Sequence, residues 1–154
     1  MNEQLWGMEI TLEQLLIGFG DTLYMVFFSL LFSSFIGLPL GILLVITRKG
    51  HILENKWVFN LLNPIINILR SVPFIILLVA LIPFTRFVVG SAIGTNAAIV
   101  PLVFYAGPYI ARLVENSLLE VDKGIIEAAQ SMGATEWQII LRFLIPEGLS
   151  SLVL

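Results

Sequence analysis

The chain has 154 residues, of which 58% are hydrophobic and only 12% are charged. Soluble domains carry about 25% charged residues, so this composition excludes an ordinary soluble domain and indicates an integral membrane protein. The sequence contains no cysteine, which excludes disulfides and thiolate chemistry, and its net charge of -3 gives no sign of a nucleic-acid partner.

The first expected element is a membrane span over residues 22–47, because this run carries no charge and about 20 apolar residues suffice to cross a bilayer as a helix. Small residues that recur every four positions place one narrow stripe on this helix, which predicts close packing against another helix of this chain or of a second copy. The stripe consists of Ser29, Ser33, Gly37 and Gly41.

The charges on either side of this span predict its direction. Only acids precede it, whereas Arg48, Lys49 and Lys56 follow it directly. By the positive-inside rule, the N-terminus lies outside the cell and the short basic loop lies in the cytoplasm. His51 falls in this loop, where we expect a solvated side chain without a functional role.

Residues 57–70 carry a polar stripe at helical spacing and an apolar opposite face. We predict a helix in the inner membrane interface, because Arg70 inside the bilayer would cost about 2.5 to 3.5 kcal/mol. In the alternative interpretation the asparagines of the stripe line a translocation path, which makes Asn67 and Arg70 pathway candidates. The stripe consists of Lys56, Asn60, Asn63, Asn67 and Arg70.

Two further apolar stretches predict a second span over residues 71–90 and a third over residues 95–111. Prolines interrupt both stretches, and carbonyls that lose their partner to a proline should face protein or a water-filled cavity. Gly107 and Pro108 are our preferred pointer to the pathway. The alternative is that each proline is simply tolerated in a membrane helix.

Several kinds of chemistry have no motif in this sequence. There is no G-x-x-x-x-G-K-[ST] loop to cradle phosphates, so we expect no nucleotide hydrolysis by this chain, no enzyme activity, no cofactor and no metal site. No pair of carboxylates lies inside a predicted span, which disfavours a proton-coupled carrier.

Residues 112–147 turn polar and predict a folded cytoplasmic region, and residues 148–154 would begin a fourth span. Asp122 can cap a first helix that Gly133 ends, and Thr135 with Gln138 forms a capping box for a second helix. The pattern predicts a helix, a glycine turn and a helix. Such a unit fits either a rigid projection into a partner's cleft or an amphipathic hairpin packed on its own bundle, and the sequence leaves both open.

The hairpin region contains a spaced string of residues. Glu127-Ala-Ala-Gln-Ser-Met-Gly133 is followed, after nine residues, by Phe143-Leu-Ile-Pro146. This string resembles the EAA loop of permease subunits of bacterial ABC importers. Phe143 stands where isoleucine is usual and Ile145 where leucine is usual, so apolar replaces apolar. The resemblance implies that a cytoplasmic ATPase docks on Glu127, Ala128, Ala129, Gly133, Phe143, Ile145 and Pro146.

Three other stretches look more specifically like the permease of methionine importers: Arg70-Ser-Val-Pro-Phe-Ile-Ile-Leu-Leu, Ile82-Pro-Phe-Thr-Arg86 and Ala111-Arg-Leu-Val-Glu-Asn116. This likeness implies the all-α helical bundle of a type I importer in the bacterial inner membrane, present as a homodimer. It also implies two ATPase subunits that bind the ATP, and an external substrate-binding lipoprotein. Family members continue into two more spans after the loop, so we expect a C-terminally truncated chain. Alternatives are a permease for polar amino acids and a membrane anchor that recruits a cytoplasmic partner.

Overall fold

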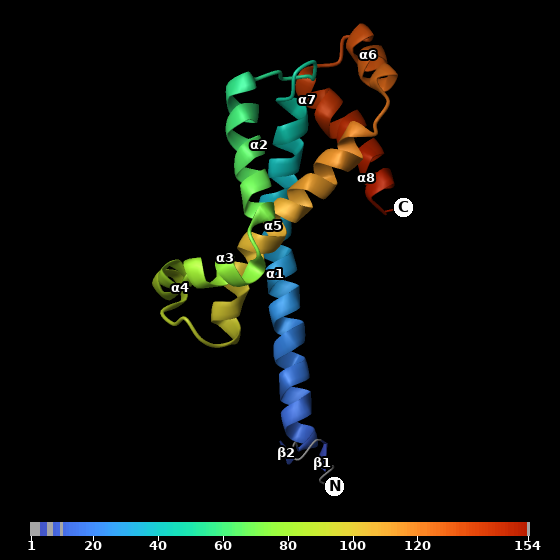
Figure 1. Ribbon diagram of the computed structural model, residues 1–154. Helices are drawn as coiled ribbons and strands as arrows, with labels where there is room; N and C mark the ends of the chain where they lie inside the picture. Colours follow the sequence, from blue (N-terminus) through green and yellow to red (C-terminus); the bar gives the residue numbers. More distant parts are fainter. Residues whose placement is uncertain (1–3, 6–7, 10, 154) are drawn as a thin grey trace.

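The computed structural model describes residues 4–5, 8–9 and 11–153. The regular secondary structure of this part of the chain is helical apart from two short antiparallel strands, β1 (Gln4–Leu5) and β2 (Met8–Glu9). The all-α prediction is confirmed. The helices, shown in Figure 1, are α1 (Leu12–Ile46), α2 (Lys56–Ser71), α3 (Phe74–Ala80), α4 (Ile82–Val89), α5 (Thr95–Leu119), α6 (Lys123–Ser131), α7 (Glu136–Ile139), the π-helical turn η1 (Ile140–Leu144) and α8 (Ile145–Val153).

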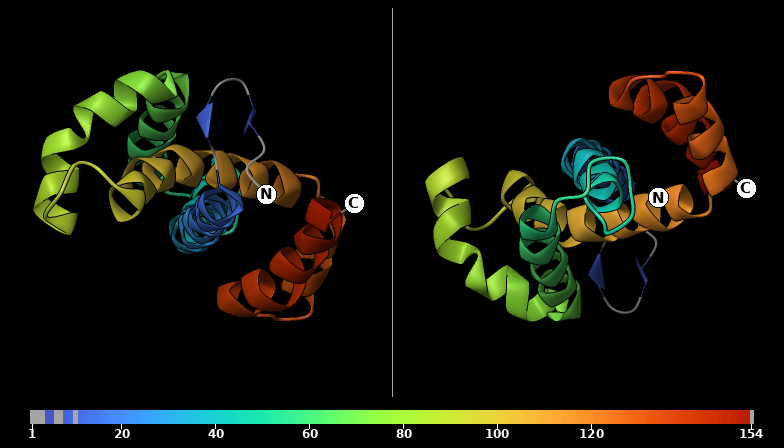
Figure 2. Two further views of the ribbon diagram at one scale, coloured as in Figure 1. Left: turned by 90° about the horizontal axis from the view of Figure 1, so that it is seen from below. Right: turned by 90° about the horizontal axis from the view of Figure 1, so that it is seen from above.

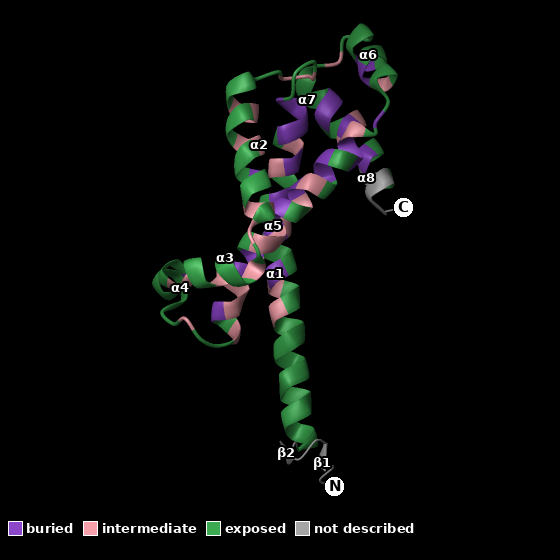
Figure 3. Cartoon of the chain, viewed as in Figure 1, coloured by how far each residue is buried: buried purple, intermediate pink, exposed green. Residues whose placement is uncertain are grey.

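Helix α1 is longer than the span predicted over residues 22–47. It has 35 residues, about 52 Å at 1.5 Å per residue, and begins at Leu12, where the Thr11 N–H donates a hydrogen bond of 3.2 Å to Gln14 Oε1. Its N-terminal half projects away from the other helices, and its apolar side chains there are exposed (Figure 1, Figure 3). Within the described residues, α1 and α5 are the two single helices that are long and apolar enough to cross a membrane.

The small-residue stripe of α1 packs against α5 of the same chain. A Cβ atom placed on Gly37 would lie 2.8 Å from the carbonyl oxygen of Gly107, and one on Gly41 would lie 2.6 Å from that of Ala111. Contacts below 3.0 Å are not tolerated by real Cβ atoms, so only glycine permits this approach. Ser33 is fully buried and its hydroxyl donates to the Val103 carbonyl at 3.4 Å. The predicted helix contact is confirmed, with its partner inside the chain.

Helix α2 covers the segment predicted as an interfacial helix over residues 57–70. It runs alongside the C-terminal half of α1, as Figure 1 and the views along α1 in Figure 2 show, and its Ile66 is buried with Leu44 and Ala111. The interfacial position stays a prediction. Pairing the polar stripe with another helix would remove the cost that argued against insertion.

The segment predicted as a single span over residues 71–90 is not one continuous helix. Helices α3 and α4 have 7 and 8 residues, which is about 11 and 12 Å and too short to cross the hydrocarbon core. Pro73 precedes the first residue of α3, and Pro83 lies in the first turn of α4, so each proline starts a new helix. The chain turns by 107° between α2 and α3. Helices α2 and α3 together form the third possible, broken span.

Helix α5 extends beyond the span predicted over residues 95–111, and its last two turns lie in the region expected to be a cytoplasmic loop. It remains helical through Pro101 and Pro108. Helix α8 begins at Ile145, ahead of the predicted residues 148–154, of which Leu154 lies outside the described residues. One core cluster joins the end of α1, the end of α5 and the segment from α6 to η1.

Candidate functional site

The segment from α6 to η1 forms the predicted helical hairpin at one end of the molecule (Figure 1). Asp122 caps α6 by accepting the Gly124 N–H at 2.7 Å. Gly133 ends the first helix with φ at 80°, a left-handed conformation that suits glycine. The Thr135 N–H donates to Gln138 Oε1 at 2.9 Å, and the Gln138 N–H donates back to Thr135 Oγ1 at 3.4 Å. These caps arise from neighbouring residues, and the predictions for them are confirmed.

The inner face of the hairpin is seated on the membrane helices. Ala129, Ile139 and Leu144 are each at most 1% exposed, and they belong to one core cluster with Val45 of α1 and Leu118 of α5. Fully burying a side chain of the size of isoleucine or leucine stabilises the contact by roughly 1.5 to 3 kcal/mol. The hairpin is therefore packed on its own bundle, as one of the two open interpretations predicted.

The outer face of the hairpin carries exposed apolar side chains next to the first residues of the EAA string. Glu127 and Ala128 are exposed on α6. Further along the hairpin, Met132, Trp137 and Leu141 are 74%, 65% and 62% exposed. Trp137 and Leu141 are four residues apart and so share one face of the α7–η1 helix. This outer face, defined by these five residues, is free to contact a partner.

The second half of the EAA string faces the other way. Phe143 and Ile145 are half-buried against the core cluster, whereas Pro146 is exposed. Both side chains attach the hairpin to the bundle, and their role in docking an ATPase stays a prediction. Pro146 has no N–H to donate to the carbonyl of Arg142, and the helix widens into the π-turn η1 just before it.

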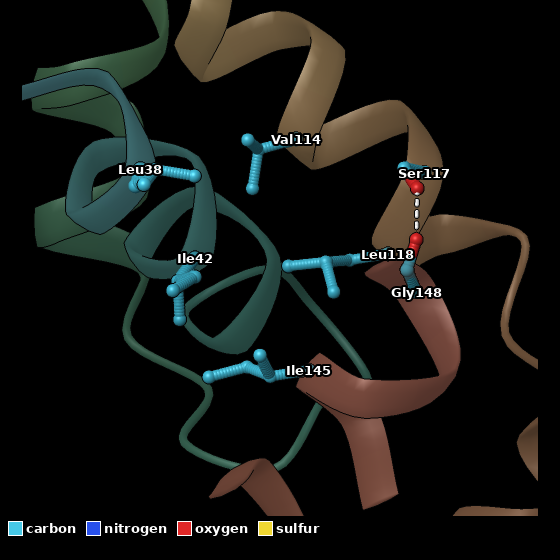
Figure 4. A pocket seen from close by; sticks show the side chains of 7 residues that line it. All are labelled: Leu38, Ile42, Val114, Ser117, Leu118, Ile145 and Gly148. Carbon is cyan, nitrogen blue, oxygen red and sulfur yellow. Dashed lines mark hydrogen bonds between the residues drawn. The ribbon is translucent and has the colours of Figure 1, made fainter. Parts of the chain in front are cut away.

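Ile145 contributes to a small cavity of about 30 Å³ between three helices. In Figure 4, Leu38 and Ile42 of α1 approach Val114 and Leu118 of α5, with Ile145 of α8 completing the lining.

The contact of α5 with α8 at this cavity is close. Ser117 donates a hydrogen bond to the carbonyl of Gly148 (Figure 4). A Cβ on Gly148 would collide with Leu118 Cδ2, so only glycine permits this approach of α8 to α5.

His51 lies against α6, contrary to the expectation of a solvated loop residue. It is half-buried and lines a cavity of about 160 Å³ with Lys123 and Glu127 of α6. Burial lowers the pKa of His51 below its usual value, and the positive charges of Lys123 and Arg48 lower it further. No local pattern could have indicated this, because the contact joins residues more than 70 positions apart in the sequence.

A buried charged cluster lies between α1, α2 and α5. Glu115 is 2% exposed and pairs with Arg112, one turn earlier on α5, and with Arg48 at 3.5 Å. Arg112 also donates to the side-chain oxygens of Asn63 and Asn67 on α2, the latter at 2.7 Å. Sequence reasoning assigned Arg112 to a cytoplasmic loop and gave Glu115 no role. The spacing of three residues between them is the signal that could have found the pair.

The four pathway candidates separate into two groups. Gly107 and Pro108 are buried, and the carbonyl of Gly107 lies against Gly37 of α1. In this structure they pack helices together. Asn67 is exposed, with its side chain bound to Arg112, and Arg70 lies 5.0 Å from the centre of the Tyr109 ring. These two share the α2–α5 face.

Nothing in the described residues resembles a metal centre, since no group of three or more histidine, aspartate or glutamate side chains comes together there.

Comparison with known proteins identifies the family. Residues 37–153 match the model of the binding-protein-dependent transport system inner membrane component. A probable D-methionine transport system permease protein MetI of Pasteurella multocida (strain Pm70) is 56% identical over 86% of this chain and 61% of its own length. The D-methionine transport system permease protein MetI of Escherichia coli (strain K12) is 54% identical over 88% of this chain and 63% of its own length.

Solved structures agree with the sequence comparisons. An inward-facing structure of the MetNI methionine ABC transporter has a TM-score of 0.86 at 53% identity, covering 90% of this chain and 64% of the matched chain. A crystal structure of an amino acid ABC transporter with histidines has a TM-score of 0.60 at 20% identity, which shows the shared fold alone. The chain spans about 61 to 63% of the length of these two curated relatives. With most of its residues matched, the chain belongs to the family of binding-protein-dependent transport system inner membrane components.

Proposed function

We propose that this chain is the permease part of an ATP-driven methionine importer and that its hairpin docks a separate ATPase subunit. The observation that carries this proposal is the two-sided hairpin. Its inner face is seated on α1 and α5, and its outer face leaves Glu127 and three large apolar side chains exposed. Exposed apolar groups outside the bilayer are typical of protein interaction surfaces, and tryptophan and charged neighbours often dominate such contacts.

The connection between the hairpin and the membrane supports a coupling role. Helix α5 leads into α6 through a short segment that contains Val121, which is buried in the core cluster. Leu144 at the far end of the hairpin belongs to the same cluster. A displacement of the hairpin by a closing ATPase pair is therefore transmitted to α5 and to α1, which packs along it. ATP would be bound and hydrolysed by the partner, consistent with the absence of a phosphate-binding motif here.

Methionine is the substrate favoured by the relatives, whose names specify D-methionine transport at more than 50% identity. A permease for polar amino acids has weaker support, because the amino acid transporter matched at 20% identity shares only the fold. The proposed assembly is a homodimer with two ATPase subunits and an external substrate-binding lipoprotein. Arg48, Lys49 and Lys123 lie at the end of the molecule that carries the hairpin, which supports an outside N-terminus.

A charge reversal on the outer face tests the docking. In the full-length protein co-expressed with its ATPase, Glu127→Lys should abolish ATPase co-purification and uptake of labelled methionine, with membrane insertion intact. Glu13→Lys is the matched control, since it reverses an exposed acid in the first turn of α1, at the opposite end of the molecule. Normal co-purification with Glu127→Lys would contradict docking at this face. A membrane anchor without transport would retain co-purification in the unaltered protein and show no uptake.

A further inference from the structure

The attachment of α2 to the rest of the molecule has an apolar part and a polar part. In the apolar part Ile66 is buried, and Phe59 and Leu62 pack beside it. The polar part belongs to Arg112, whose Nη2 donates to Asn63 Oδ1, to the Asn63 carbonyl at 3.4 Å and to Asn67 Oδ1 at 2.7 Å. Asn63 and Asn67 are one helical turn apart, so a single guanidinium edge contacts one face of α2.

The other edge of the same guanidinium is held by Glu115. Arg112 Nη1 donates to Glu115 Oε2, and Glu115 Oε1 lies 3.5 Å from Arg48 Nη1, just beyond the end of α1. Glu115 is 2% exposed, and a carboxylate this deeply buried is tolerated only when it is paired and hydrogen-bonded. One carboxylate thus connects the end of α1 and the body of α5 with the arginine that contacts α2.

We propose that Glu115 is a positioning residue that aims Arg112 at Asn63 and Asn67 and thereby fixes α2 to the helix leading into the hairpin. Only arginine suits this task, because its planar fork can donate along two edges at once, whereas the ammonium of a lysine is a compact point charge. If the hairpin couples an ATPase to the membrane helices, as the proposed function states, this link would carry hairpin movements from α5 to α2.

The chemistry of the cluster predicts the effect of neutralising Glu115. Glutamine retains the size of the side chain but removes the negative charge that compensates Arg112, which is only 15% exposed. An arginine without a counter-charge in such a site lowers its free energy by turning toward solvent, where water hydrates the charge. Its bonds to Asn63 and Asn67 would then be lost, and α2 would sample several positions against α5.

A distance measurement tests this link without reference to transport. The 154-residue sequence contains no cysteine, so spin labels can be attached at Leu61→Cys on α2 and Leu113→Cys on α5, both more than 60% exposed. The sample is the full-length protein with its ATPase, with any cysteine outside residues 1–154 replaced by serine. We expect one narrow distance distribution, which Glu115→Gln broadens. An unchanged distribution in a folded Glu115→Gln protein would overturn the proposal.

A second variant covers the case in which Glu115→Gln does not fold. Asn63→Ala with Asn67→Ala leaves the buried ion pair intact and removes only the acceptors on α2, so it should broaden the distribution as well. Asn60→Ala is the matched control, because Asn60 lies on the same polar stripe and is exposed, whereas the hydrogen bonds of Arg112 to α2 go to Asn63 and Asn67. A double variant that behaves like Asn60→Ala would overturn the link to α2.

Transport then tests the coupling role of the link. Methionine taken up per ATP hydrolysed should fall in the Asn63→Ala, Asn67→Ala protein by about 5- to 150-fold, the usual range of coupling between two sites, and should not change in Asn60→Ala. Broadened distances with unchanged uptake per ATP would overturn the coupling role. If the unaltered protein imported no methionine, the proposed function would fail while the distance data still decided the positioning role.

Discussion

Helix α5 packs in two different ways along its length. Against α1, the contact is made by Gly37 and Gly41, which let the two backbones approach until a single added carbon would collide. Toward its end, Leu118 of α5 joins a core cluster with large aliphatic side chains of the hairpin such as Ile139 and Leu144, which are almost completely removed from solvent. The two contacts belong to one helix and lie only a few turns apart.

The difference reflects the solvent on each side. Inside a bilayer, an aliphatic side chain gains little by leaving lipid for protein, so helix association relies on close approach and on bonds such as that of Ser33 with Val103. Outside the bilayer, each buried aliphatic side chain is removed from water, so larger side chains contribute more to stability.

The largest expected effect comes from adding bulk to the membrane contact. Gly41→Leu should separate α1 from α5, because its first side-chain carbon already falls 2.6 Å from the Ala111 carbonyl. Thermal stability and monodispersity of the detergent-solubilised protein measure this. Gly20→Leu, in the same helix with nothing within 4 Å of the added carbon, is the control and should behave like the unaltered protein. Equal behaviour of both variants would refute the close packing of α1 on α5.

Removing bulk from the hairpin contact should have the next largest effect. Leu144→Ala leaves a cavity in the core cluster and should lower the free energy of local opening by about 2 to 5 kcal/mol. Hydrogen exchange of the α6 and α7 amides reports this opening. Leu141→Ala, three residues earlier and 62% exposed, should change exchange little while weakening ATPase docking. If both leucines had the same effect on exchange, the assignment of inner and outer faces would be wrong.

The smallest expected effect is a pH dependence at the edge of the hairpin. The pKa of His51 lies below its usual 6.5, chiefly because burial disfavours the charged imidazolium. The folded state therefore binds fewer protons than the unfolded state, so the contact of the loop with α6 is fully stable above pH 6.5 and weakens as the pH falls through the lowered pKa. Melting temperatures at about pH 7.5 and about pH 5.5 should differ less in His51→Gln than in the unaltered protein. An identical difference in both proteins would show that His51 does not cause the pH dependence.

Local features of the hairpin could be predicted from sequence because neighbouring residues cause them. Asp122 and Thr135 cap helices through backbone groups two or three positions away, and Gly133 adopts a conformation that other residues avoid. The stripe from Ser29 to Gly41 was likewise predictable, since helical periodicity alone places these residues on one face. In each case the cause lies within one or two turns of the effect.

The features that sequence reasoning missed depend on distant partners. The orientation of α2 depends on Arg112, which lies 49 residues from Asn63 and removes the cost of a polar stripe beside a membrane helix. The inward direction of Phe143 and Ile145 depends on a core supplied by α1 and α5.

The sequence by itself determined a membrane composition, the stripe on α1, the helical hairpin with its caps, and the family string that begins at Glu127. Only the tertiary structure decided that α2 stands beside α1, that residues 71–90 fold as two short helices, and that Glu115 holds Arg112 in place. The physical reason is that periodicity and capping are set by bonds along the chain. The direction of an amphipathic face, and the cost of burying a charge, depend on which distant residue is present to meet it.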